Sequence, residues 1–307
     1  MKNDQPKNFR DKLTFDFIVN QFLAFRLFKL LPSLSPWIAS DTFFLKVYYR
    51  LAMGRMLNLK APKRYTEKLQ KLKLMNKGQD FSRLVDKYQV REIVKEKIGA
   101  TYLIPLIGVW EDFNAIDFDK LPHQFVLKTT HDSGTVLICT DKTKFDKQNA
   151  KIKLTHALKR NYFYLSREYP YRYAVPRIIA EQYLFDETQK ELDDYKFFCF
   201  DGQPKFVEIT TGKGKDKQRG YYDLDLQPMP FRLGNATNRP ITENLSFIPE
   251  MEQLASVLSK DLKHVRIDLY IVNHRIYFGE YTFHHSGGLF QVNPDEWDAK
   301  IGDLVAI

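Results

Sequence analysis

Eight short runs of β-branched and aromatic residues between positions 102 and 283 limit the folds open to this chain. Each run has the length of one strand and is bounded by polar, Gly or Pro residues, as is typical of β-strands. Helical patterns near 147–165 and 249–261 lie between some of the runs, which favours a mixed α+β fold. The predicted strands are 102–109, 124–130, 135–139, 177–184, 195–200, 204–210, 265–272 and 275–283.

Two helices and one tight hairpin are also predicted. Residues 66–77 and 80–98 repeat apolar side chains at helical spacing, and Gly99 stands where a helix C-terminus is commonly capped. The pair Asp201-Gly202 separates two predicted strands and predicts a two-residue turn, since both central residues of a type I′ turn need a positive φ. With 307 residues, the chain has room for one large or two ordinary domains.

The charge is distributed unevenly. Residues 1–100 carry 21 Lys and Arg against 9 Asp and Glu, whereas residues 101–307 carry 26 against 29. A concentrated positive field attracts anionic partners such as a membrane surface or nucleic acid, although a solvated helical face explains it equally well. No recognised nucleic-acid motif accompanies it. The two cysteines, Cys139 and Cys199, cannot build a disulfide framework, so we expect a cytoplasmic protein.

Residues 12–31 are rich in Phe and Leu but contain four charged residues. They therefore lack the roughly 18 uncharged residues of a membrane-spanning helix, and no cleavage site of a signal peptide follows them. Two alternatives stay open for this segment. It is either an interfacial helix at the anionic inner face of a membrane or a helix packed on the protein's own core.

Lys128 ends the apolar run FVLK and is followed by the polar loop THDSG and another strand. A lysine at this position can bring an ammonium group to phosphates, while the N–H groups and hydroxyls of the loop cover them. The alternative is a lysine that extends into solvent. The motifs GxxxxGK[ST] and GxGxxG are both absent.

Asp268 and Glu280 form a candidate metal site on two neighbouring strands. In RIDLY, alternation places Arg266, Asp268 and Tyr270 on one face and the aliphatic residues on the other. The two carboxylates share a face only if the intervening turn has an odd number of residues, for instance residues 273–275. Such oxygen ligands suit Mg²⁺. The alternative is a carboxylate paired with Arg266.

Two further segments suggest ligand binding. Glu181 ends an apolar run and is followed by Gln182, Tyr183 and Leu184, which could line an adenine ring. Asp223-Leu224-Asp225 has the Asp-x-Asp spacing with which many glycosyltransferases bind a metal and a nucleotide-sugar. A hydrolase is disfavoured because G-x-S-x-G and HExxH are absent.

Taken in order, these pieces resemble the ATP-grasp superfamily. The similarity covers about residues 55–307 and extends to the branch associated with teichuronopeptide and capsular-polysaccharide biosynthesis. It rests on the strings EKLQKLKL, LVDKYQVRE, FVLKTTHDSG, RIIAEQYL, DYKFFCFDGQPKF, RIDLY and YFGEYTF. One departure is visible, because the metal motif of the superfamily usually ends Glu-x-Asn and here ends with Thr282.

The resemblance implies two antiparallel-sheet subdomains that enclose ATP, with a helical N-terminal extension. It implies residues 1–60 as the basic extension, 61–120 as a preceding region and 121–307 as the ATP-grasp domain, divided into lobes 121–184 and 185–307. The implied catalytic residues are Lys128, Lys196 and Arg266, and the implied metal ligands are Asp268 and Glu280. The implied ATP-binding residues are Lys87, Lys128, Ser133, Gly134, Glu181, Gln182, Tyr183, Leu184, Glu187 (or Glu191) and Lys196.

The implied activity is an ADP-forming carboxylate–amine ligase that uses Mg²⁺ and ATP in bacterial surface-polysaccharide biosynthesis. The expected partners are a saccharide precursor with a carboxylate and an amine or amino acid, with no nucleic acid. A glycosyltransferase that uses Asp223 and Asp225 remains the alternative.

Overall fold

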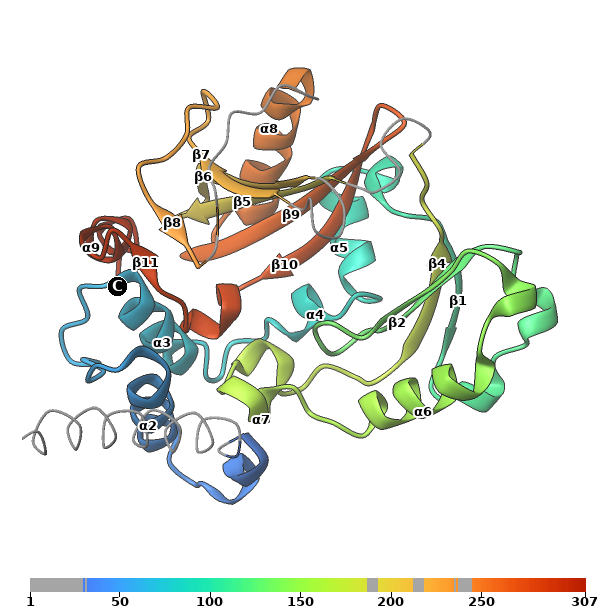
Figure 1. Cartoon of the computed structure of the whole chain (residues 1–307), viewed down its shortest axis with the longest axis horizontal. Helices are drawn as coiled ribbons and strands as arrows, with labels where there is room; N and C mark the ends of the chain where they lie inside the picture. The colour runs from blue at the N-terminus through green and yellow to red at the C-terminus, as the bar shows by residue number, and fades with distance from the viewer. Residues whose placement is uncertain (1–29, 31, 187–192, 212–217, 235, 237–244) are drawn as a thin grey trace, which may run out of the picture.

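The computed structural model describes residues 30, 32–186, 193–211, 218–234, 236 and 245–307. Two antiparallel sheets dominate it, one of four strands in the order β1-β4-β2-β3 and one of five in the order β10-β9-β5-β6-β7. Figure 1 shows the two sheets on either side of α4 and α5. The predicted α+β class with two antiparallel-sheet subdomains is therefore confirmed.

The described elements follow in chain order. The helices are α2 (Asp41–Met53), α3 (Tyr65–Met75), α4 (Ser82–Val85), α5 (Val90–Lys97), α6 (Lys147–Leu158), α7 (Phe163–Ser166), α8 (Ile248–Ser259) and α9 (Glu296–Asp303). The strands are β1 (Leu106–Trp110), β2 (Phe125–Thr129), β3 (Val136–Cys139), β4 (Ile178–Gln182), β5 (Asp193–Phe200), β6 (Gln203–Thr211), β7 (Gln218–Tyr222), β8 (Arg232–Leu233), β9 (His264–Val272), β10 (Arg275–Thr282) and β11 (Val292–Asn293).

Each large sheet buries one face under a helix. In the first sheet, Phe125 and Leu127 of β2 pack with Leu154 of α6. In the second sheet, the aliphatic residues of β9 at 265, 267, 269 and 271 form one core with α8, as their alternation predicts. The opposite faces, which carry Lys128 in β2 and Asp268 in β9, are left to form the site between the sheets.

The segment 80–98 is not the single helix that its periodicity predicts. It forms α4 and α5 with a break at Asp86, whose backbone is extended (φ −75°, ψ 111°). The Asp86 carboxylate accepts the N–H groups of Tyr88 and Gln89 at 2.9 and 3.1 Å, which stabilises the turn that precedes α5. Lys87 therefore lies in the junction and not within a helix. Its backbone N–H donates to Thr130 O, which joins the junction to the loop after β2.

Two hairpins of the second sheet have two-residue turns. Asp201 and Gly202 have φ values of 44° and 75°, which confirms the predicted turn between β5 and β6. The turn between β9 and β10 also has two residues, Asn273 and His274. The prediction that Asp268 and Glu280 share a face only if this turn has an odd number of residues was wrong, because it assumed a regular ladder. The ladder is irregular, because a β-bulge at Gly279 shifts the register by one residue and places Glu280 opposite Asp268.

The N-terminal helices and α9 close one end of the second sheet. Tyr65 and Leu69 of α3 pack with Phe198 and Phe200 of β5. The Asp298 carboxylate of α9 accepts the N–H group and hydroxyl of Thr66 at 2.9 and 2.8 Å. Most of the segment 12–31 lies outside the described residues. Over the part of the chain that the structure describes, no helix is both long and apolar enough to cross a bilayer.

Candidate functional site

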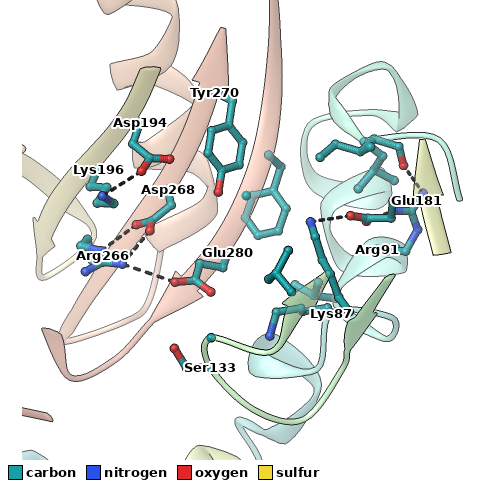
Figure 2. A pocket seen from close by; sticks show the side chains of 18 residues that line it. Lys87, Arg91, Ser133, Glu181, Asp194, Lys196, Arg266, Asp268, Tyr270 and Glu280 are labelled. Atoms are coloured by element: carbon teal, nitrogen blue, oxygen red, sulfur yellow. Dashed lines mark hydrogen bonds and ion pairs between the residues drawn. The ribbon is translucent and has the colours of Figure 1, made fainter. Parts of the chain in front are cut away.

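A cavity of about 230 Å³ lies between the two sheets. Figure 2 shows its labelled side chains approaching one another from both sheets and from the α4–α5 junction. It brings together the predicted residues Lys87, Lys128, Ser133, Gly134, Glu181, Lys196, Arg266, Asp268 and Glu280. A neighbouring cavity of about 280 Å³ shares Lys128 and Glu181 and adds Gln182, Tyr183 and Leu184. Glu187 and Glu191 lie outside the described residues.

On the side of the cavity formed by the first sheet, two cationic side chains contact the carboxylate of Glu181. Lys128 of β2 and Glu181 of β4 lie on adjacent strands, with Lys128 Nζ 2.7 Å from Glu181 Oε2. Arg91 of α5 places Nη1 3.3 Å from Glu181 Oε1 and donates through Nη2 to Ile104 O at 2.8 Å. Glu181 thus holds two cations at the junction of the two cavities. Arg91 was missed at the sequence level, since nothing local separates it from a surface arginine.

The loop after β2 is held by Asp132. Its buried carboxylate accepts the hydroxyls of Thr129 and Thr135, the latter at 2.6 Å, while Lys87 Nζ donates to the Asp132 carbonyl. These contacts leave Ser133 and Gly134 exposed at the tip, where both line the cavity. Gly134 has a φ of 92°, a conformation that favours glycine. The loop can therefore present backbone N–H groups and a hydroxyl to an anionic ligand.

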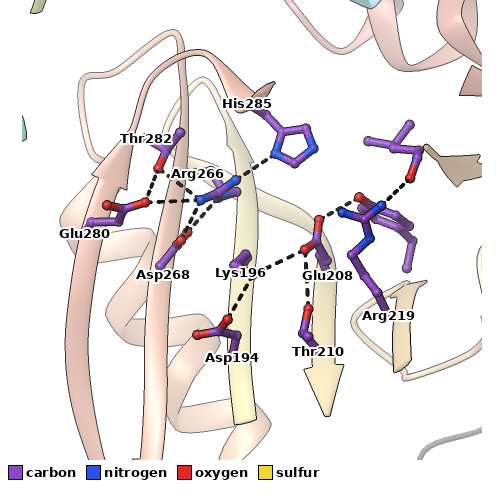
Figure 3. A network of polar contacts seen from close by, with 12 residues as sticks. Asp194, Lys196, Glu208, Thr210, Arg219, Arg266, Asp268, Glu280, Thr282 and His285 are labelled. Atoms are coloured by element: carbon purple, nitrogen blue, oxygen red, sulfur yellow. Dashed lines mark hydrogen bonds and ion pairs between the residues drawn. The ribbon is translucent and has the colours of Figure 1, made fainter. Parts of the chain in front are cut away.

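Arg266 is the centre of a polar network on the second sheet (Figure 3). Its Nε and Nη2 donate to the two Asp268 oxygens at 2.7 and 2.6 Å. Nη2 also lies 3.3 Å from Glu280 Oε1 and 3.1 Å from Thr282 Oγ1, and Nη1 donates to His285 Nδ1 at 2.7 Å. Among the described residues, His285 Nδ1 is the one side-chain partner of Nη1.

The contact with Arg266 determines the tautomer of His285. A guanidinium group only donates hydrogen bonds, so Nδ1 of the histidine must be the acceptor. The neutral ring then carries its proton on Nε2. Burial, followed by the positive charge of Arg266, lowers the pKa of His285 to about 3, which keeps the ring neutral.

Lys196 of β5 lies between two carboxylates. Its Nζ is 3.2 Å from Asp194 Oδ2 and 3.3 Å from Glu208 Oε1, and Glu208 also accepts the Tyr221 hydroxyl at 2.6 Å. Burial disfavours the ammonium form, but Glu208 and Asp194 outweigh this effect and raise the pKa of Lys196. A permanently charged ammonium group therefore faces the cavity beside Asp268, its neighbour in the ladder.

Asp268 and Glu280 are the candidate ligands of a cation of the Mg²⁺ type, but both Asp268 oxygens accept hydrogen bonds from Arg266, so the alternative of a carboxylate paired with Arg266 is observed. They are direct cross-strand partners, and Glu280 Oε2 has no hydrogen-bond partner among the residues that the structure describes. Burial and the negative charge of Glu280 raise the pKa of Asp268 to about 7, although the Arg266 guanidinium acts in the opposite direction, as a bound cation also would. The described ranges contain no cluster of three His, Cys, Asp or Glu side chains. Two protein carboxylates with phosphate and water as the other ligands is a usual arrangement for Mg²⁺.

The rival Asp-x-Asp segment lies elsewhere. Asp223 and Asp225 follow β7, and neither lines the cavities formed by Lys128 and Glu181. The Asp223 carboxylate accepts the Gln227 N–H at 2.7 Å, which stabilises the local turn.

The sequence profile of the family described as TupA-like ATP-grasp matches residues 67–306. The chain belongs to the TupA-like ATP-grasp family. The match includes both large sheets and all the cavity-lining residues named above, and it begins within α3.

Solved structures similar to this TupA-like ATP-grasp chain include three ligases or synthetases. D-alanine–D-alanine ligase from Bacillus anthracis complexed with ATP has 15% identity, a TM-score of 0.37 and coverage of 65% of this chain and 55% of its own. ATP-grasp ligase PsnB complexed with minimal precursor has 10% identity, a TM-score of 0.39 and coverage of 74% of this chain and 61% of its own. D-cycloserine synthetase DcsG has 15% identity, a TM-score of 0.38 and coverage of 73% of this chain and 71% of its own. The chain thus spans 55% and 61% of the length of the first two. No curated protein sequence matches it.

Proposed function

We propose that this chain is an ADP-forming carboxylate–amine ligase that uses Mg²⁺ and ATP. The observation that carries the proposal is the meeting of three lysines, two arginines and four carboxylates around one cavity. These groups come from the α4–α5 junction, from α5 and from both sheets, and they include the charges that a metal-bound triphosphate requires. Membership of an ATP-grasp family supports the same substrate.

The two adjoining cavities suggest how ATP binds. Gln182, Tyr183 and Leu184 line the more apolar cavity, which suits adenine. Lys128 and Glu181 line both cavities, so the sugar and phosphates would extend past them toward the second sheet. Lys87, Lys196 and the loop tip at Ser133 and Gly134 would then contact the phosphates. Glu187 stays a proposed ribose ligand outside the described residues.

The reaction has two steps. A carboxylate oxygen of the acid substrate attacks the γ-phosphorus, the bond to the bridging oxygen breaks, and ADP leaves. An amine then attacks the acylphosphate carbonyl, inorganic phosphate leaves, and the amide forms with release of a proton. When bound by Asp268 and Glu280, Mg²⁺ would neutralise phosphate charge. Arg266 and Lys196 would stabilise the charge of the transferring phosphoryl group.

We further propose that the substrates are a carboxylated saccharide precursor of a bacterial surface polysaccharide and an amine or amino acid. The resemblance to the surface-polysaccharide branch supports this choice. We also propose peripheral contact with an anionic membrane on the cytoplasmic side. The basic surplus of residues 1–100 supports it, as do exposed Leu34, Trp37 and Phe43, with Trp37 87% exposed.

The decisive experiment is an ADP-release assay on the purified chain with MgATP and a panel of uronic acids and amino acids. We expect ADP and phosphate to appear only when both an acid and an amine are present. Lys128→Ala should lower release at low ATP concentration by about 100-fold, whereas Asp223→Asn should not, because Asp223 does not line the cavity. Turnover of a nucleotide-sugar without ATP would overturn the proposal in favour of a glycosyltransferase.

A further inference from the structure

Three ionisable side chains from distant parts of the sequence meet in the protein interior. They are Lys73 of α3, Glu168 after α7 and His284 after β10, with exposed fractions of 0%, 4% and 2%. None of them lines the cavity of about 230 Å³ between the two sheets. Burial of charged groups costs several kcal/mol each unless they are paired. A buried cluster of this kind therefore needs contacts that compensate for its desolvation.

Those contacts converge on residues 284–288. Glu168 Oε2 lies 3.3 Å from His284 Nδ1, which holds the first residue of the segment. Lys73 Nζ donates to Gly287 O at 2.7 Å. Gln70, one turn earlier in α3, donates to Gly287 O and Gly288 O at 3.0 Å each. The first end of the segment is therefore attached to Glu168, and the second end is attached to α3.

The segment needs this support because its backbone is unusual. Ser286, Gly287 and Gly288 have φ values of 48°, 62° and 68°, so three consecutive residues are left-handed. This conformation is unfavourable for serine. At Gly288, a Cβ would lie 2.5 Å from Gln70 Nε2 and 2.9 Å from Leu69 Cβ. Only glycine allows α3 to approach the turn so closely.

His285 lies between the two attached ends, and its Nδ1 accepts the hydrogen bond from Arg266 Nη1 (Figure 3). We infer that Lys73, Glu168 and His284 are positioning residues, which hold the 284–288 turn so that His285 orients the Arg266 guanidinium. The opposite edge of that guanidinium is held by Asp268. The kinetic consequence of this arrangement rests on the proposed ligase function, but the geometry does not.

The first test records the ring nitrogens of His285 by NMR in the full chain labelled with ¹⁵N-histidine, without ATP. His285→Gln assigns the signals, which should report an Nε2–H tautomer. Lys73→Met should shift or broaden them. Lys71→Met is the matched control, because Lys71 lies in the same helix and its side chain makes no hydrogen bond or ion pair with another described residue. Unchanged His285 signals in Lys73→Met would overturn the inference, whether or not the ligase proposal holds.

The second test is a double-mutant cycle on ADP release. We expect Lys73→Met and His285→Gln each to lower kcat by about tenfold, since a displaced catalytic group costs this much or more. KM for ATP should stay nearly unchanged. The double variant should be no slower than His285→Gln alone, because both changes act through one contact. If Lys73→Met does not fold, Gln70→Ala takes its place. If the double variant instead lost the product of the two single losses in kcat, the two side chains would act independently. That result would show a purely structural role for Lys73 and overturn the inference.

Discussion

Glu280 lies directly opposite Asp268 in the β9–β10 ladder, although the two-residue turn that joins these strands would pair Asp268 with residue 279. The extra residue is taken up by the bulge at Gly279. A Cβ at this position would lie 2.7 Å from Tyr270 Cε2 and 3.0 Å from Asp268 O. Glycine at the bulge therefore permits the alignment of the two proposed metal ligands.

Gly279→Ala should disturb this alignment. The added methyl group must displace the Tyr270 ring or the Asp268 backbone, so we expect a loss of about 1–3 kcal/mol in unfolding free energy from overpacking. ADP release should fall by about tenfold or more, because misplaced ligands position the phosphates poorly. Urea denaturation and the ADP assay check the two effects. Full activity in the folded variant would contradict the role given to the bulge.

Lys128→Met should weaken ATP binding without unfolding the chain. The side chain is partly exposed and pairs with Glu181 at 2.7 Å, so its removal leaves Glu181 still paired with Arg91. We expect turnover at low ATP concentration to fall by about 100-fold, as a charge-assisted phosphate contact is lost. Lys205→Met, which removes an exposed lysine of β6, is the control. Equal effects of the two variants would argue against a phosphate contact.

Glu280→Gln should separate metal binding from nucleotide binding. Calorimetric titration with ADP in the absence of Mg²⁺ should give nearly the same affinity as the unaltered chain. With Mg²⁺ present, the variant should lose at least about tenfold in affinity, a typical cost of altering a metal ligand or its support. Loss of ADP binding without Mg²⁺ would instead indicate that Glu280 contacts the nucleotide or supports the fold.

Asp86→Ala should destabilise the α4–α5 junction. The carboxylate is fully buried, accepts two N–H groups and lies 3.6 Å from Arg177 Nη1. Loss of hydrogen bonds of this kind, from backbone N–H groups to a side chain near the start of a helix, costs about 0.5–2 kcal/mol. ADP release should fall as well, because Lys87 follows directly in the junction. Glu96→Ala, an exposed change within α5, should alter neither the urea midpoint nor the rate.

Glu208 should make the protein sensitive to acid. Burial alone would raise its pKa, but the charge of Lys196, the hydrogen bond from Tyr221 and the charge of Arg266 outweigh burial and lower it to about 2 from an ordinary value of 4.5. The folded state thus binds this proton less readily than the unfolded state. The stabilisation is complete above pH 4.5 and lost as the pH falls toward 2, by about 3 kcal/mol in total. Urea denaturation between pH 6 and 2.5 should show a shallower decline for Glu208→Gln than for the unaltered chain.

Several features followed from local sequence because local physics controls them. Alternation in β9 predicted that Val265 and Ile267 face the core while Arg266 and Asp268 face the site. The pair Asp201-Gly202 predicted its turn, since few residues accept two positive φ values in succession. Helical periodicity located α3, and Gly99 marked the end of α5. Each of these predictions depends only on neighbouring residues and on the chirality of the chain.

Other features depended on contacts between segments far apart in sequence. Helical periodicity continued across Asp86, but the buried Asp86 carboxylate holds the turn before α5 and faces Arg177, and the helix is interrupted there. The spacing between Asp268 and Glu280 implied a turn with an odd number of residues. The structure instead has a bulge at Gly279, which packs against Tyr270. The partners of Lys73 are almost 100 and more than 200 positions away. Strand alternation decided which residues face the site, because the direction of a side chain is a local property. The tertiary structure decided which of those residues contact one another, because strand register and buried charge pairs depend on residues that are distant in the sequence.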